Sequence, residues 1–166
     1  EAIGRYLPPF WSRGNPVDLV GTRDLEVPVV AVEELVKWDG IHAVLSLGIV
    51  GRIELVRLLV ESTRLADPTV SPDFLQQIEE LSAAYEKQYT EKMVDLMELY
   101  EKPIIGVSLT STGDRTVYPV KGKRYSGVFF QTPETAVSVL SAMVAHQSSV
   151  YGHPDQETVF MKRVWV

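Results

Sequence analysis

The chain has 166 residues, of which 45% are hydrophobic and 23% charged, and it contains no cysteine. This length and composition are typical of one globular domain, and the lack of cysteine excludes disulfides, thiolate metal sites and cysteine nucleophiles. The net charge of −6 is unlike that of nucleic-acid-binding surfaces, which are rich in lysine and arginine. No apolar run approaches the roughly 18 residues of a membrane span. We therefore expect a cytoplasmic protein that binds neither nucleic acid nor membrane.

Residues 1–21 are rich in turn-forming proline and glycine and show no sustained hydrophobic period, which is typical of a connecting segment that packs on the body. Within this segment, residues 17–20 are predicted to form a short strand. The chain begins at Glu1 rather than Met and shows no signal-peptide pattern, which indicates an excised domain or a fragment.

Three elements are predicted next along the chain. Apolar residues at steps of three and four predict a helix over residues 27–38, and Gly40 suits the left-handed position that ends such a helix. Residues 41–47 form an apolar run typical of a strand buried on both faces. A second helix is predicted over residues 51–65, with Ile53, Val56, Leu59 and Val60 on one side.

The longest predicted element is a helix from Asp73 to Lys102. Ser71 is a good N-cap, Pro72 fits the first helical position, and neither glycine nor proline occurs within the helix itself. One straight helix of this length would measure about 45 Å and would span or project beyond a compact domain. Two helices separated by a kink are the alternative.

The remaining elements complete an α/β pattern. Strands are predicted over residues 104–109 and 126–130, with an edge pair around residues 117–120. Thr132 is then the N-cap of a helix that runs to residue 149. Alternating strands and helices predict a mainly parallel sheet with helices on both faces.

A turn with two glycines follows the first strand. It contains Gly48, Ile49, Val50, Gly51 and Arg52 and leads into a helix N-terminus. Ligands of α/β sheets bind at the carboxyl ends of strands, and helix N-termini favour anions. The two glycines leave the backbone open and Arg52 adds positive charge, so the turn is predicted to bind phosphate. The alternative is that both glycines serve the turn conformation alone.

No catalytic or metal-binding motif is recognised. His42, His146 and His153 are scattered and lack the spacing of a metal site, so surface or packing roles are expected for them. We predict no catalytic residue and no metal ligand. The residues alone therefore indicate an α/β domain that binds an anion.

Several short segments occur in a characteristic order: Leu7–Pro9, Asn15–Gly21, Trp38–Gly40, Ile41–Leu45, Lys102–Val107 and Phe130–Val137. Their order resembles the second flavodoxin-like CoA-ligase domain of the NDP-forming acyl-CoA synthetases, the superfamily of ADP-forming acetyl-CoA synthetase and succinyl-CoA synthetase. The turn Gly48-Ile49-Val50 with Arg52 is similar to the Gly-Gly-Ile-Val-Arg turn of the succinyl-CoA synthetase β subunit.

This resemblance implies a three-layer flavodoxin-like domain over residues 22–150. The first βα unit is absent, residues 71–102 are a long inserted helix, and residues 151–166 are a tail or linker. In the missing unit's place the sheet would have a central gap, which residues 158–166 are predicted to fill. The alternative is that the tail begins a linker to the next domain and that the sheet has rearranged so that no gap exists.

The resemblance also implies a ligase that interconverts acyl-CoA, phosphate and NDP with acid, CoA and NTP. A phosphohistidine carried by another domain transfers the phosphate. CoA, ATP or ADP and Mg are expected for the whole enzyme and no cofactor for this chain. The implied partners are the CoA-binding and ATP-grasp domains of the same enzyme or subunit, and a homo-oligomer is compatible with this arrangement. The isolated chain is predicted to be inactive, because it encodes neither the histidine nor a nucleotide fold.

Two other hypotheses stay open. The first is a non-catalytic α/β interaction module whose long helix docks a partner. The second is a flavodoxin-type cofactor binder, although the chain lacks a Ser/Thr-rich phosphate loop after a first strand.

Overall fold

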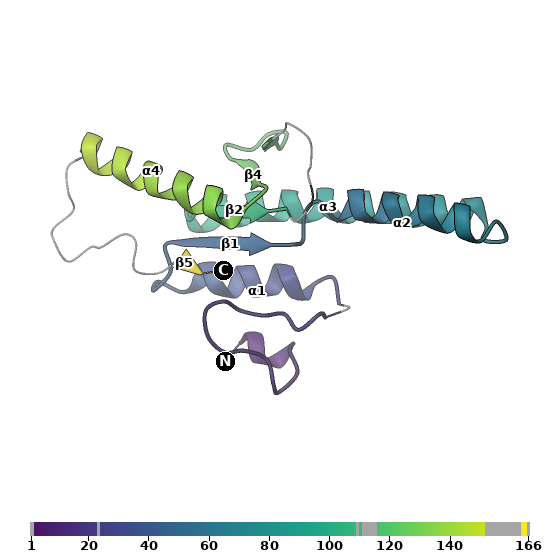
Figure 1. The fold of residues 1–166 in the computed structure, drawn as a ribbon. Coiled ribbons are helices and arrows are strands. Elements are labelled where there is room, and N and C mark those ends of the chain that lie inside the picture. Colours follow the sequence, from purple (N-terminus) through teal and green to yellow (C-terminus); the bar gives the residue numbers. More distant parts are fainter. Residues whose placement is uncertain (1, 23, 109, 111–115, 152–163, 166) are drawn as a thin grey trace.

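The computed structural model describes residues 2–22, 24–108, 110, 116–151 and 164–165, which form an α/β fold (Figure 1). Its helices are the short 3-10 helix η1 (Ile3–Arg5), α1 (Val27–Lys37), α2 (Arg52–Ala66), α3 (Pro72–Tyr100) and α4 (Pro133–Tyr151). Its strands are β1 (Ala43–Leu47), β2 (Ile104–Val107), β3 (Val117–Pro119), β4 (Ser126–Phe130) and β5 (Val164–Trp165). The predicted alternation of strands and helices is confirmed.

The sheet is mixed and mostly parallel, with the described strands in the order β3-β4-β2-β1-β5. Parallel neighbours are β1 with β2, β2 with β4 and β1 with β5, whereas β3 pairs antiparallel with β4 as predicted for an edge. The expected central gap is absent, because β1 pairs directly with β2 from Val44 opposite Ile104 to Leu47 opposite Val107. The tail contributes β5 to the edge beside β1 instead, and the predicted strand residues 158–163 lie outside the described residues.

Helices cover both faces of this sheet. On one face, Val44 and Ile104 belong to a core shared with α1 and α3. On the other face, Leu45 and Ile105 pack with residues of α4. Successive residues of a strand point to opposite faces, so strands between two helical layers are apolar at every position. This explains the apolar runs of β1 and β2, in which Ser46 of β1 is the polar exception.

Helix α3 is continuous over 29 residues, or about 43 Å, so this stretch forms one helix rather than two. The amide of Phe74 donates to Ser71 Oγ at 3.5 Å, as predicted for the N-cap. The second half of α3 contributes five residues to the main core: Tyr89, Met93, Val94, Leu96 and Met97. The first half pairs with α2, and the two helices project beyond the sheet as a hairpin (Figure 1).

Two local predictions are wrong. Residues 17–20 do not form a strand. Residues 17–19 have no regular secondary structure, and Val20, with a φ of 54°, lies in a turn that the Thr22 amide closes by donating to the Leu19 carbonyl at 3.1 Å. The segment does pack on the body, where Leu7 is buried and Val17 contacts the core. Gly40 is not left-handed, because α1 ends with Trp38 in an extended conformation (ψ 121°).

Candidate functional site

The predicted phosphate-binding turn lies at the carboxyl end of β1, where it opens α2. Gly48 and Gly51 have φ values of 73° and 89°, in the region that favours glycine. The amide of Gly48 donates to the Val107 carbonyl at 3.0 Å and so continues the pairing of β1 with β2. A Cβ on Gly51 would lie 1.9 Å from Ser108 Oγ, so this position also requires the absence of a side chain. Both glycines therefore have a conformational reason to be present, and Gly51 has a steric one as well.

The other three predicted residues divide between core and surface. Ile49 and Val50 are buried in the main core. Arg52 is exposed, and its Nε donates to the Gly48 carbonyl at 2.6 Å. The structure thus brings all five predicted residues together in one turn. Only backbone amides and the Arg52 guanidinium remain as groups that could meet a phosphate.

A carboxylate of the protein already occupies the N-terminus of α2. The backbone amide of Ile53 donates to Glu86 Oε1 of α3 at 2.7 Å, across 33 residues of sequence. Negative charge is favourable at this end of a helix, and a bound phosphate would have to lie beside the Glu86 carboxylate. Sequence reasoning missed this residue, since no local pattern links it to the turn. The phosphate role of residues 48–52 stays a prediction.

A cavity of about 440 Å³ borders the same turn and is lined by Arg52, Tyr85 and Tyr89 among others. Tyr89 is 2% exposed, and its hydroxyl lies 2.6 Å from Ser46 Oγ. Burial raises the pKa of Tyr89, and it also raises the pKa of Tyr85, whose hydroxyl donates to the Leu25 carbonyl at 3.0 Å. Both phenols are therefore neutral hydrogen-bonding groups at neutral pH. Neither is activated as a base.

The hairpin of α2 and α3 carries an unusual surface. Four leucines of α2 are exposed to between 49% and 77%: Leu55, Leu58, Leu59 and Leu65. Their spacing at 100° per residue places them on one stripe of the helix. Val60, by contrast, is buried. The sequence prediction that placed Leu59 on the same side as Val60 is therefore wrong, because α2 has two apolar sides and only one of them is covered.

The projecting half of α3 adds to this surface. Phe74 and Leu81 are 55% and 71% exposed, and their separation of seven residues places them on the same side of α3. We call the four leucines of α2 together with Phe74 and Leu81 the hairpin stripe. Large exposed apolar surface marks interaction sites on soluble proteins.

The part of the chain that the structure describes offers neither a metal centre nor a membrane span. There, no group of three or more His, Asp or Glu side chains could hold a metal ion. No helix in these residues is both long and apolar enough to cross a bilayer. His42 and His146 line a different cavity, at the end of the sheet where β1 and β2 begin, opposite to the turn. His153 lies outside the described residues.

The chain was also compared with known proteins. No protein-family model, curated protein or solved structure matches it.

Proposed function

We propose that this protein is a non-catalytic α/β interaction module that associates with a second copy of itself through the hairpin stripe. The observation that carries the proposal is the uncovered second side of α2. Its four leucines lie on a part of the molecule that projects beyond the sheet, where no other described element covers them (Figure 1). Homo-oligomers with two-fold symmetry are the commonest assemblies of soluble proteins.

The charges of the hairpin favour a second copy as the partner. Helix α2 has three arginines and two glutamates, a net charge of +1, whereas residues 72–91 of α3 have one lysine and five acidic residues, a net charge of −4. In the proposed dimer, α2 of each copy lies against α3 of the other. Opposite net charges then face each other twice, which steers association and selects this partner over a like-charged one.

The apolar contribution requires several leucines to act together. Association costs about 4–15 kcal/mol in lost freedom of motion. Full burial of one leucine contributes only about 1.5–3 kcal/mol, but a two-fold contact brings in the leucines of both copies. The result is a four-helix arrangement in which each stripe packs against the other.

Sedimentation equilibrium tests this proposal at micromolar concentration. We expect the wild-type chain to have about twice its monomer mass of 18.6 kDa. The double variant Leu58→Glu/Leu65→Glu should be monomeric with an unchanged circular dichroism spectrum. The control is Leu99→Glu, because Leu99 is 68% exposed, like Leu58 at 67%, but lies at the far end of α3. A monomeric wild type, or dissociation by the control alone, would overturn the proposal.

A second candidate function is the one that the sequence segments imply, a module of an NDP-forming acyl-CoA synthetase with a flavodoxin-like arrangement. The observation that favours it is the position of the turn at the carboxyl end of β1, beside Arg52 and a cavity of about 440 Å³. In this function the turn presents α2 to the phosphate carried by a neighbouring domain. The carboxylate of Glu86 then acts against phosphate binding by the isolated chain.

Phosphate titration followed by amide NMR shifts tests the second candidate. Phosphate binding should move the amide signals of Gly51 and Arg52, and Glu86→Gln should tighten it by removing the competing charge. The control is Glu91→Gln, an exposed position further along α3. Unchanged amide shifts in both the wild type and Glu86→Gln would remove the phosphate role.

A further inference from the structure

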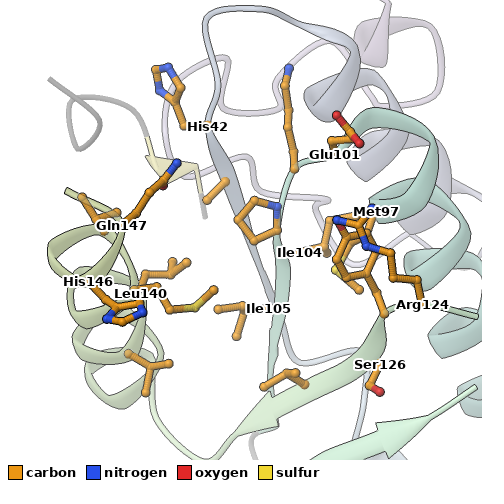
Figure 2. Close-up of a pocket in the computed structure, with 18 residues that line it drawn as sticks. His42, Met97, Glu101, Ile104, Ile105, Arg124, Ser126, Leu140, His146 and Gln147 are labelled. Atoms are coloured by element: carbon orange, nitrogen blue, oxygen red, sulfur yellow. The ribbon is translucent and has the colours of Figure 1, made fainter. Parts of the chain in front are cut away.

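A second and larger cavity lies at the opposite edge of the sheet, where β1, β2 and β4 begin. Its volume is about 820 Å³, within the range of about 300–1,000 Å³ usual for small-molecule sites. One wall is the second half of α4 and the facing wall is the end of α3 with the start of β4 (Figure 2). The floor consists of Ile104 and Ile105, at the start of β2.

The lining is apolar in the middle and polar at the rim. Leu140 and Ile105 point into the space between the two walls, whereas Arg124, Glu101 and His146 lie around it (Figure 2). Part of the α4 wall is open to water, because Met143 is 54% exposed. Methionine adapts its shape to irregular apolar ligands.

The residues that line the cavity include two cationic side chains, Lys102 and Arg124, and one carboxylate, Glu101. Lys102 Nζ donates to the backbone carbonyls of Val36 and Trp38 at 2.8 and 3.0 Å, which fixes its position without neutralising its charge. The Arg124 guanidinium lies 4.7 Å from the ring centre of Tyr125, another lining residue. Among the residues that line the cavity, these two cations and Glu101 give a net charge of +1, although the whole chain carries −6.

From this arrangement we propose that the cavity binds a small molecule with an apolar chain and an anionic end, of the fatty-acid class. The chain of the ligand lies between α4 and the floor of β2, and its carboxylate lies at the rim near Arg124. This site is independent of the proposed self-association, because the hairpin stripe contributes no residue to it.

Isothermal titration with three twelve-carbon probes tests the proposal, with the two ionic probes below their micellar concentrations and the alcohol below its solubility limit. We expect dodecanoate to bind more tightly than dodecanol, and dodecyltrimethylammonium to bind most weakly. Arg124→Gln should weaken dodecanoate binding about two- to fivefold, as expected for an exposed charge pair, and leave dodecanol binding unchanged. Equal affinity of the wild type for dodecanoate and dodecanol, or no binding of either, would overturn it.

A pair of variants on α4 locates the site. Val139 lines the cavity and Val137, two residues earlier, does not. We expect Val139→Trp to fill the cavity and lower dodecanoate affinity at least tenfold, while Val137→Trp keeps the wild-type affinity. Equal affinities of two folded variants would place the probe elsewhere and contradict the proposal.

Discussion

At the scale of single residues, two contacts connect the base of the hairpin to the core. Glu86 accepts the hydrogen bond of Ile53, and Tyr89, one helical turn later on α3, lies 2.6 Å from Ser46 at the end of β1. Both contacts join segments that are more than 30 residues apart in sequence. Each one therefore fixes tertiary structure rather than the local helix.

The Glu86 contact is expected to stabilise the fold through both charge and hydrogen bonding. Glu86→Gln retains an acceptor and should lower the unfolding free energy by about 0.3–1 kcal/mol, since only the charge at the helix N-terminus is lost. Glu86→Ala also removes the acceptor of a partly buried amide and should cost about 1–3 kcal/mol. Urea denaturation measures both values. A loss for Glu86→Ala no larger than that for Glu91→Ala would contradict this role.

Tyr89 should make stability fall at alkaline pH. An unfolded tyrosine titrates near pH 10, and burial raises the pKa of Tyr89 above that value. Above about pH 10 the unfolded chain therefore loses this proton before the folded chain does, so the unfolding free energy decreases by up to about 1.4 kcal/mol per pH unit. This contribution is fully present below pH 10.

Tyr89→Phe isolates that contribution. At pH 8 the variant should have an unfolding free energy about 1 kcal/mol lower, because the substitution removes the hydroxyl that Ser46 contacts. Above pH 10 its stability should fall less steeply than that of the wild type. Tyr6→Phe, which removes an exposed tyrosine, is the control. If the unfolding free energies of the wild type and Tyr89→Phe change with pH in parallel, the proton of the Tyr89 hydroxyl makes no contribution to the pH dependence of stability.

At the scale of elements, the two capped helices differ in what they support. Ser71 caps α3 at the tip of the hairpin, whereas the hydroxyl of Thr132 accepts from the Thr135 amide at 3.2 Å and caps α4 next to the sheet. The first turn of α3 can fray without disturbing the main core, which begins further along the helix, although fraying exposes the buried Leu75. The first turn of α4 contains the fully buried Ala136 and cannot.

The same substitution at the two caps should therefore have different consequences. Thr132→Ala should lower the global unfolding free energy by about 1 kcal/mol, the usual value of an N-cap. Ser71→Ala should instead speed amide hydrogen exchange in the first turn of α3 and leave global stability nearly unchanged. Equal losses in denaturation experiments would show that the tip of the hairpin unfolds only together with the core.

At the scale of the whole molecule, β5 lies beside β1 and covers its edge. An uncovered strand edge presents unpaired amides and carbonyls that can pair with another chain. The tail thus contributes to the sheet although it fills no central position.

Removal of residues 152–166 should lower stability and solubility together. Loss of the short β5 ladder is worth about 1–2 kcal/mol, which corresponds to a melting temperature about 2–8 °C lower in a chain of this size. The uncovered edge of β1 should also increase light scattering on heating. Unchanged melting and scattering would show that β5 contributes nothing to the sheet.

The sequence predicted most elements correctly because their signals are local. Nearly continuous apolar runs identify β1 and β2, and side-chain caps with proline identify the start of α3 and α4. The strand order could not be predicted, since nothing in a buried apolar run specifies its neighbours. The covered side of α2 was equally ambiguous because both of its sides are apolar, with four leucines on one and two valines on the other. Glu86 is an ordinary polar helix residue until the fold brings it to the turn.

The continuity of α3 has a consequence for the direction in which the hairpin faces. A single helix carries Phe74 and Leu81 at one end and Met93 at the other. The number of residues between them therefore sets the angle, measured about the helix axis, between the hairpin stripe and the core. One residue inserted after Lys87 would rotate the stripe by about 100° about the helix axis and move it outward by about 1.5 Å. Seven inserted residues, matched by a longer α2, would restore the facing to within about 20°. The hairpin can therefore be lengthened without turning the stripe away only by insertions that come close to a whole number of helical turns.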